Sequence, residues 1–366
     1  MGCFATWSAS RGWSRRPPPS SLAASKPGPD NAPRAPAGGT RPAELSILKA
    51  IQEALWLEME RDERIIVLGE DVGTLGGVFR VTRGLQERFG TDRVFDTPLA
   101  EASIVGASLG LAIGGLVPVA EIQFLSFTHQ AFHQLGPQLG RYRFRSRGRF
   151  HAQVTIRAPF GGGSRTPEHH PDALEAQLAQ MPGVKIVCPA FPVDAKGLLL
   201  SAIRDPDPVV FLEPQGLYRS VSGPVPAGDY TTPFGSSRLV REGSDLTLVG
   251  WSASVHLCLA AADALGAEGA SVAVLDLRSI VPLDVDGLVD KATSTGKVIV
   301  VQEAPLTAGF GAEVAATIQE EAFESLDAPV WRVAAPDTPY PPGALEDPYL
   351  PSLQRVLAAA REMLGY

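Results

Sequence analysis

Short apolar runs alternate with segments of helical periodicity along most of this chain. Apolar positions from Leu48 to Met59 recur at the spacing of one helix face, and we expect this helix to begin near Pro42, because proline suits a first turn. The continuous apolar run Ile65–Gly69 that follows is typical of a buried strand. This alternation predicts an α/β fold whose mostly parallel sheet is covered by helices on both faces.

The alternation is interrupted once and then resumes. In the first half, strands are predicted at residues 117–122, 154–156, 184–187 and 209–212, and helices at residues 101–111, 127–139, 173–180 and 195–203. A stretch rich in Gly, Pro, Ser and Thr breaks the pattern between Leu217 and Arg238. Beyond it, strands are predicted at residues 246–249, 271–277 and 297–301, and helices at residues 254–265, 313–323 and 351–364. We therefore expect two α/β domains, at residues 43–217 and 237–366, joined by a linker at residues 218–236.

The first 42 residues have a different composition from the rest. They are rich in Ser, Pro, Arg, Ala and Gly without a periodic apolar pattern, so we expect a disordered tail. Three arginines at residues 11–16 and the lack of acidic residues before Asp30 are similar to a mitochondrial transit peptide. The run Pro17–Pro19 would interrupt the amphipathic helix of such a peptide. This favours a solvated tail or an N-terminal extension of a cytoplasmic protein, with the mitochondrial matrix as the alternative location.

Composition and charge exclude several classes of function. The chain has 366 residues, 45% of them apolar, and its net charge of -8 is spread without long runs of one sign, so nucleic acid is not an expected ligand. The longest apolar stretch, Ile104–Ala120, is interrupted by four glycines and a proline, and we expect no membrane span. The 3 cysteines are too few and too widely spaced for a disulfide framework or a CxxC metal site, which favours a reducing compartment.

Common cofactor motifs are missing from the sequence. It has no GxGxxG after a strand, no P-loop and no HExxH, so this chain alone is not expected to build a nicotinamide or ATP site. Its one GxSxG, Gly106–Gly110, falls inside the helix predicted at residues 101–111 and not at the strand-to-helix turn that a nucleophile of this kind needs. The run Glu168-His169-His170 is a poor metal site, because adjacent residues rarely point at one ion. A loop with exposed histidines is the simpler interpretation of that run.

Several blocks match one protein family in order and spacing. They are Val67–Gly73, Phe95–Glu101, Ala120–Phe124, Asp194–Leu199, Phe211–Pro214, Asp276–Asp284, Gln302–Pro305 and Pro336–Pro341. With these blocks the chain resembles the beta subunit of the decarboxylating component of 2-oxo acid dehydrogenase complexes. The resemblance implies a transketolase-like pyrimidine-binding domain followed by a transketolase C-terminal α/β domain.

The resemblance also implies thiamine diphosphate as a cofactor. It places Glu101 against the pyrimidine ring nitrogen, where a carboxyl group that shares its proton helps the cofactor to lose its thiazolium proton. It places Phe127 as a ring stacked on the same pyrimidine, and Gln123 within reach of cofactor or substrate. Without the flanking blocks, Glu101 would be interpreted as a first-turn glutamate that the helix dipole favours.

His170 is the second catalytic candidate. Counted back from the turn at residues 181–183, it falls on the active-site histidine of the family, which implies that it orients or protonates the bound intermediate and assists acyl transfer to a lipoyl arm. Imidazole suits this work because it titrates near neutral pH. The chain departs from the family at Pro171 and Asp172, where Ser and Gln are common, and His169 is the competing neighbour.

The family further implies a structural monovalent cation, potassium, held by the carbonyl groups of Val154, Ala202, Asp205 and Asp207. Asp207 stands where a neutral Asn is common, but backbone carbonyls do not depend on side-chain identity. A simple helix-to-strand turn at residues 204–208 explains the same segment, so both interpretations remain open.

Half of the expected cofactor site is missing. Family members bind the diphosphate and Mg²⁺ through a motif that begins with Gly-Asp-Gly and ends in Asn, whereas this sequence has no Gly-Asp-Gly and its only asparagine is Asn31. The resemblance therefore implies an alpha subunit that holds Mg²⁺ within an α2β2 heterotetramer. It also implies a lipoyl-bearing acyltransferase component that receives the acyl group. The missing motif argues against a single-chain transketolase-like enzyme, and the Glu101 block argues against a scaffold without a cofactor.

Two blocks bear on the 2-oxo acid substrate. Glu213–Arg219 and Glu303–Thr307 look closer to the branched-chain branch of the family than to the pyruvate branch. We therefore expect oxidative decarboxylation of a branched-chain substrate such as 2-oxoisovalerate, with the pyruvate dehydrogenase beta subunit as the alternative. Pyruvate and 2-oxoisovalerate differ by two carbon atoms, and a pocket discriminates one methylene group by only about 1–3 kcal/mol.

Overall fold

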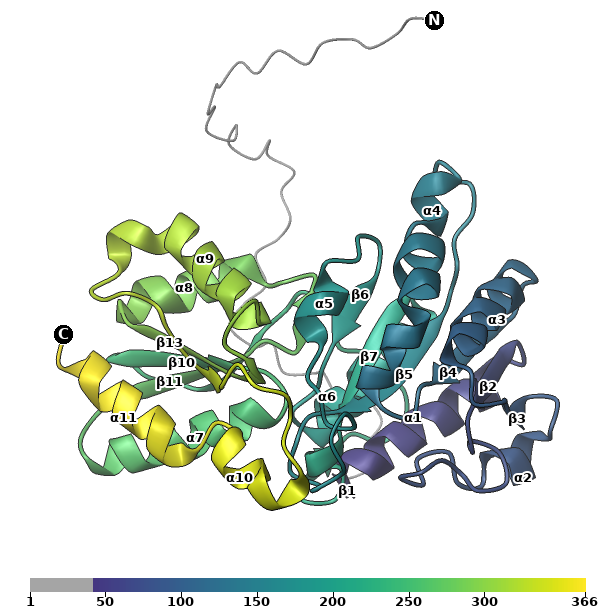
Figure 1. Cartoon of the computed structure of the whole chain (residues 1–366), viewed down its shortest axis with the longest axis horizontal. Helices are drawn as coiled ribbons and strands as arrows, with labels where there is room; N and C mark the ends of the chain where they lie inside the picture. The colour runs from purple at the N-terminus through teal and green to yellow at the C-terminus, as the bar shows by residue number, and fades with distance from the viewer. Residues whose placement is uncertain (1–41) are drawn as a thin grey trace, which may run out of the picture. The chain divides into compact units, whose positions relative to one another are not determined.

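The computed structural model describes residues 42–366, so the prediction of a disordered or transit-like tail falls outside the described residues (Figure 1). Within these residues two α/β sheets form, one of seven strands and one of five, together with a separate two-stranded ribbon. This confirms the predicted fold class. None of the helices in the described range combines the length and the apolarity that crossing a membrane requires.

The seven-stranded sheet has the order β12-β6-β7-β5-β4-β2-β3. All of its strands are parallel except β12, at one edge. Their bounds are β2 Ile65–Gly69, β3 Val94–Asp96, β4 Val117–Glu121, β5 Thr155–Phe160, β6 Lys185–Val187, β7 Val209–Pro214 and β12 Ser279–Val281. Along β2, Ile65 and Val67 enter one hydrophobic core, whereas Ile66 and Leu68 enter another, because successive side chains point to opposite faces.

Helices cover both faces of this sheet. Helices α1 (Ile47–Arg61) and α6 (Pro192–Arg204) pack together over one face. The opposite core contains residues of α3 (Glu101–Ile113), the 3-10 helix Leu125–Ala131 and the π-helix Gln134–Gly140. Shorter helices are α2 (Leu85–Phe89), α4 (Tyr142–Arg145) and α5 (Glu175–Ala179).

The five-stranded sheet has the order β14-β13-β10-β11-β9, with only β9 antiparallel. Its strands are β9 Arg238–Arg241, β10 Leu246–Gly250, β11 Val272–Asp276, β13 Val298–Pro305 and β14 Trp331–Ala335. Helices α7 (Ala253–Ala267) and α11 (Leu353–Leu364) share a core on one face, and α8 (Val285–Thr295) and α9 (Phe310–Ala322) pack on the other. Helix α10 (Glu346–Tyr349) precedes α11.

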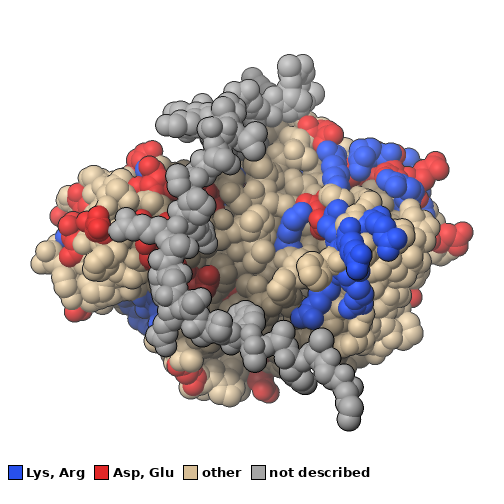
Figure 2. All heavy atoms as spheres, turned by 90° about the horizontal axis from the view of Figure 1, so that it is seen from above, with Lys and Arg blue, Asp and Glu red and all other residues tan. Residues whose placement is uncertain are grey.

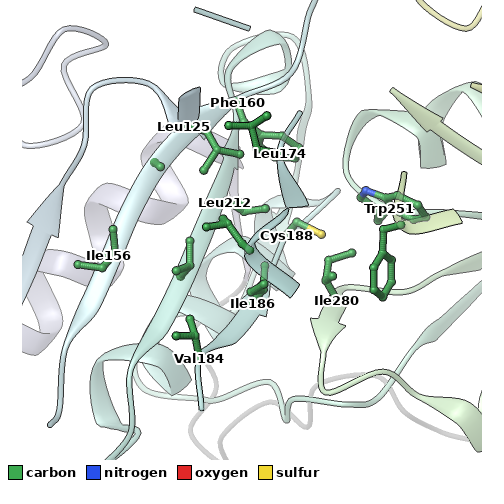
Figure 3. Packing of buried hydrophobic residues seen from close by; sticks show 14 of the residues in the cluster. Leu125, Ile156, Phe160, Leu174, Val184, Ile186, Cys188, Leu212, Trp251 and Ile280 are labelled. Atoms are coloured by element: carbon green, nitrogen blue, oxygen red, sulfur yellow. The ribbon is translucent and has the colours of Figure 1, made fainter. Parts of the chain in front are cut away.

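One hydrophobic core joins the two sheets (Figure 3). Trp251 and Ile280, from the second half of the chain, belong to the same buried cluster as Ile186 and Cys188 from the first half. The Trp251 indole also donates a hydrogen bond to Glu175 Oε1 over 3.1 Å. The two sheets are therefore coupled by packing as well as by the chain connection.

Two local predictions were wrong, and one strand was not predicted. Helix α1 begins at Ile47 and not near Pro42, because the Ser46 hydroxyl caps the helix by accepting a hydrogen bond from Lys49 N. Residues 43–46 instead form strand β1. This strand pairs with β8 (Ser222–Val225), which lies in the expected linker. The helix expected at residues 127–139 is divided into 3-10 and π turns, consistent with Pro137, which has no N–H to donate. Strand β12 joins the first sheet, although it lies beyond the linker.

Basic side chains gather over α4 on the face seen in Figure 2. Arg141, Arg143, Arg145 and Arg147 line an open hollow of about 1230 Å³ beside Phe144. The Phe144 side chain is 88% exposed, which is unusual for a large apolar residue. This surface, defined by residues 141–147, has the composition of a contact region rather than of an ordinary solvated helix.

Candidate active site

The predicted cofactor residues lie at one edge of the first sheet. Strands β2, β3 and β4 are parallel neighbours in register, so the residues that follow them meet at their common carboxyl edge. Glu70 and Asp71 follow β2, Glu101 follows β3, and Gln123 follows β4. Ligands of open α/β sheets bind at this edge, which makes it the candidate active site.

Glu101 and Glu70 form a pair of buried carboxyl groups at this edge. Glu101 is the first residue of α3 and is 2% exposed, and Glu70 is 6% exposed. Within the described residues, Glu101 Oε2 and Glu70 Oε1 have no hydrogen-bond partner. Buried polar atoms are normally satisfied, so these oxygens fit a ligand that brings its own polar groups, such as the pyrimidine of thiamine diphosphate.

The pKa of Glu70 is raised to about 7, first by burial and then by the nearby carboxylates of Glu101 and Asp71. Between about pH 4.5 and 7, Glu70 therefore stays protonated in the folded chain, whereas it loses its proton in the unfolded chain. The contribution of this carboxyl group to stability falls as the pH rises through that window. Sequence reasoning gave Glu70 no role, although its position directly after a buried strand could have identified it.

Gln123 is held by Asp71, the residue that follows Glu70. Its Nε2 donates to Asp71 Oδ2 over 2.9 Å, and Asp71 adopts a left-handed backbone with φ of 59°. This contact orders the amide at the edge of the site. Contact of Gln123 with cofactor or substrate stays a prediction.

Phe127 and His170 come together although they are far apart in sequence. The His170 ring packs edge-on against Phe124 and Phe127, with ring centroids 4.5 and 5.3 Å away. Phe127 lies in the 3-10 helix that packs against α3, the helix that begins with Glu101. Sequence reasoning missed Phe124, because its contact with the histidine depends on how the loop before His170 folds back.

The two neighbouring histidines have different surroundings. His170 Nδ1 lies 3.0 Å from the carbonyl oxygen of Glu168, which favours the tautomer that donates from Nδ1 and leaves Nε2 as the acceptor. His169 is exposed, and its Nδ1 lies 3.4 Å from Asp172 Oδ2. The oriented ring of His170 therefore suits proton transfer better than the ring of His169 does, and its catalytic role stays a prediction.

A buried ionic group lies beneath the same edge. Arg157, on β5, donates from Nη1 to Glu121 Oε2 over 2.7 Å and from Nη2 to Glu213 Oε2 over 3.0 Å, and all three side chains are buried. The Tyr218 hydroxyl also donates to Glu213. Burial raises the pKa of Glu121, although the charge of Arg157 opposes this shift. The group connects β4, β5 and β7 below the loops that carry the candidate site.

Of the residues expected to hold potassium, Asp205 and Asp207 lie in the turn between α6 and β7. Ala202 lies in the last turn of α6, and Val154 directly precedes β5. The carbonyls of Val154 and Ala202 accept hydrogen bonds from Val209 N and Asp205 N over 3.0 and 3.3 Å. Lys185 Nζ lies 2.6 Å from Asp205 Oδ2, and Arg143 Nε lies 2.5 Å from Asp207 Oδ1. The positive charges of Lys185 and Arg143 balance the negative charges of the two carboxylates, so charge balance at this turn does not require a bound metal cation. Cation binding by the carbonyl groups stays a prediction.

Known proteins match both halves of the chain. Residues 43–221 match the family described as transketolase, pyrimidine binding domain, and residues 235–356 match transketolase, C-terminal domain. Pyruvate dehydrogenase E1 component subunit beta of Bacillus subtilis is 51% identical over 324 residues, which are 88% of this chain and 100% of that protein. The protein of the same name from Staphylococcus aureus is 49% identical over equal shares.

Solved structures show the same fold. A split gene transketolase, an inactive beta4 tetramer, superposes with a TM-score of 0.70 at 24% identity, covering 88% of this chain and 99% of that chain. Transketolase from Leishmania mexicana superposes with a TM-score of 0.65 at 17% identity, covering 90% of this chain and 48% of that chain.

Together, the fold and the matched domains define a subunit of the thiamine-diphosphate-dependent, transketolase-like enzymes. Within that class, the chain belongs to the 2-oxo acid dehydrogenase beta-subunit family. The family prediction is confirmed. The named relatives favour the pyruvate alternative over the branched-chain substrate that the two sequence blocks suggested.

Proposed function

We propose that this chain is the beta subunit of a pyruvate dehydrogenase E1 enzyme, which decarboxylates pyruvate and transfers the acetyl group to a lipoyl arm. The observation that carries the proposal is the pair of buried carboxyl groups, Glu101 and Glu70, with unsatisfied oxygens at the carboxyl edge of the sheet. The 51% identity to a pyruvate dehydrogenase E1 beta subunit over its whole length supports this substrate. The bacterial origin of the relatives favours the cytoplasm over the mitochondrial matrix.

Thiamine diphosphate, when bound, would supply the electron sink for decarboxylation, which no protein side chain provides. This chain would hold its pyrimidine ring. Glu101 would share a proton with the ring nitrogen, and the buried position of the carboxyl group strengthens that hydrogen bond. Phe127 would stack on the ring, and Gln123, fixed by Asp71, would orient it or the substrate.

A second chain would complete the site. The Gly-Asp-Gly motif for Mg²⁺ and the diphosphate is absent from this sequence, so we propose that an alpha-type subunit holds Mg²⁺ in an α2β2 assembly. Leu99, just before Glu101, is 77% exposed and Phe144 is 88% exposed. Burial of such side chains against a partner would be favourable. The arginines at residues 141–147 beside Phe144 would suit an acidic patch on that partner.

The proposal is tested with the purified chain alone and after assembly with an alpha-type subunit of the same family. We expect no detectable decarboxylation by the chain alone with thiamine diphosphate and Mg²⁺, and turnover after assembly. Comparing kcat/KM for pyruvate and 2-oxoisovalerate then identifies the substrate. Robust turnover by the isolated chain would contradict the split site, and a preference for 2-oxoisovalerate would restore the branched-chain interpretation.

His170 provides a second test in the assembled enzyme. We expect His170→Ala to impair acyl transfer to lipoamide more than decarboxylation with an artificial electron acceptor, because its oriented imidazole would move a proton during transfer. The loss in the complete reaction should be about 10²–10⁴-fold. His169→Ala is the matched control and should cost much less. Equal losses in the two variants would show that the wrong histidine has been selected.

The turn between α6 and β7, together with Ala202 in α6 and Val154 before β5, remains a proposed potassium site. Carbonyl groups from four residues would suit a hard monovalent ion, as the family resemblance implies. The ion pairs Lys185–Asp205 and Arg143–Asp207 already order this turn, so bound potassium would add to an existing structure. We therefore attach no catalytic role to it.

A further inference from the structure

The segment that carries His170 crosses between the two sheets. This glycine loop, residues 161–170, leaves β5 at the carboxyl edge of the first sheet. Its beginning is fixed from the first domain, where Gln215 Nε2 donates to the carbonyl oxygen of Gly161 over 2.5 Å. Gly216 lies so close to Gly162 O that a side chain at position 216 would overlap it.

The second domain holds the same loop from the other side. Gly162 N donates to Glu303 Oε2 over 3.3 Å, and Glu303 lies on β13, 141 residues away along the chain. A Cβ atom at Gly161 would overlap Glu303 Oε2, and one at Gly162 would overlap the Tyr340 hydroxyl. Gly161 also has φ of 79°. Only glycine allows the backbone to approach the carboxylate this closely.

Glu303 lies in acidic surroundings. Glu175 on α5 and Glu346 on α10 lie near it, and the Tyr340 hydroxyl donates to Glu346 Oε1 over 2.7 Å. Burial first, and then these two carboxylates, raise the pKa of Glu303 to about 7, whereas the Gly162 N–H lowers it. The other titratable or charged groups on the loop and on the segments beside it are Arg165, Glu168, His169, His170, Asp172, Asp337, Asp347 and Tyr349.

We propose that Glu303 is a positioning residue for the reaction: its carboxylate holds the glycine loop through Gly162 N–H and so fixes the ring of His170 against Phe124 and Phe127. The proposal rests on the proposed function, because it takes His170 as the proton-transfer group. By this proposal, a residue of the second domain positions a proton-transfer group of the first domain. Small displacements of a reacting group cost large factors in rate, up to about 10²-fold for 1 Å.

Three variants of the assembled enzyme test this role. Glu303→Ala removes the acceptor, Glu303→Gln keeps a neutral acceptor of the same shape, and Glu320→Gln removes an exposed carboxylate from α9 as the charge control. We expect Glu303→Ala to lower kcat for acyl transfer by about tenfold or more with KM little changed. Glu303→Gln should restore most of that loss, and Glu320→Gln should match the wild type.

A pH comparison separates positioning from a merely structural role. A charged acceptor binds an N–H more strongly than a neutral one, and Glu303 becomes charged as the pH rises through about 7. The ratio of wild-type kcat to Glu303→Gln kcat should therefore increase between pH 6 and 8. A ratio that does not change with pH would overturn the proposal, and this test remains available if Glu303→Ala fails to fold.

Amide hydrogen exchange gives a readout without turnover. In the full chain, the peptide covering residues 161–170 should exchange on the order of tenfold faster in Glu303→Ala than in the wild type. Unchanged exchange, or a wild-type kcat in Glu303→Ala, would overturn the proposal. If the wild-type assembly decarboxylates no 2-oxo acid, the proposed function fails, whereas the exchange result still decides whether Glu303 holds the loop.

Discussion

Glu101→Gln should slow turnover of the assembled enzyme by about 10²–10⁴-fold, the range expected for loss of a group that shares a proton in the reaction. The carboxyl group is 2% exposed, and its Oε2 has no partner in the described chain, so it is free to bond to the pyrimidine nitrogen. Glutamine has the same shape but cannot transfer that proton. Hydrogen–deuterium exchange at the thiazolium carbon of the bound cofactor measures the affected step directly.

Folding of this variant should be normal. Glu101 lies near Glu70, whose pKa it helps to raise, so neutralising position 101 removes a repulsion between buried carboxylates. The thermal midpoint of Glu101→Gln should therefore equal or exceed that of the wild type. The matched control is Glu87→Gln, which changes an exposed first-turn glutamate of α2 and should leave thiazolium exchange unaltered. Wild-type exchange in Glu101→Gln would remove Glu101 from the mechanism.

The main elements of the fold were predictable because their signals are local. The apolar run at Ile65–Gly69 forms β2 with the predicted bounds, and the last helix, predicted at residues 351–364, forms as α11 at Leu353–Leu364. Strand β12 was not predictable in this way. Its partner β6 lies about ninety residues earlier, and no local pattern tells a strand after a linker to join the preceding sheet.

In the candidate site, too, some residues could be predicted from the sequence and others could not. Glu101, Gln123 and Phe127 were identified through the family resemblance, and the structure adds the contacts that sequence spacing cannot reveal. Phe124 acquires its contact with His170 only because the glycine loop folds back. Glu303 reaches that loop from another domain.

The blocks that suggested a branched-chain substrate contain residues with contacts inside the chain. Glu213 is fully buried and accepts from Arg157, and Tyr218 in the same block is 1% exposed and donates to Glu213. Glu303, in the second block, accepts from Gly162 N. These contacts are internal to the chain, so they give no direct reason to prefer one 2-oxo acid over another.

Arg157 carries the largest expected effect on stability. Its guanidinium is 0% exposed and is the cation shared by Glu121 and Glu213, so Arg157→Met leaves two buried carboxylates without their ion partner. We expect a loss of about 3–5 kcal/mol in the free energy of unfolding at pH 8, the cost of breaking a buried ion pair on one side. Urea denaturation of the isolated chain measures this loss, and Arg64→Met is the control, because Arg64 is 58% exposed in its pair with Asp62.

The loss in Arg157→Met should also depend on pH in a defined direction. Burial already raises the pKa of Glu121 in the wild type, and removing the guanidinium raises it further, so the folded variant binds protons that the unfolded chain releases. The deficit should therefore be smaller at pH 5.5 than at pH 8. Adding Glu213→Gln to Arg157→Met should recover part of it at pH 8, because one unpaired carboxylate is then neutral. A deficit no larger than that of Arg64→Met, and equal at both pH values, would show that the buried group contributes no more than a surface ion pair.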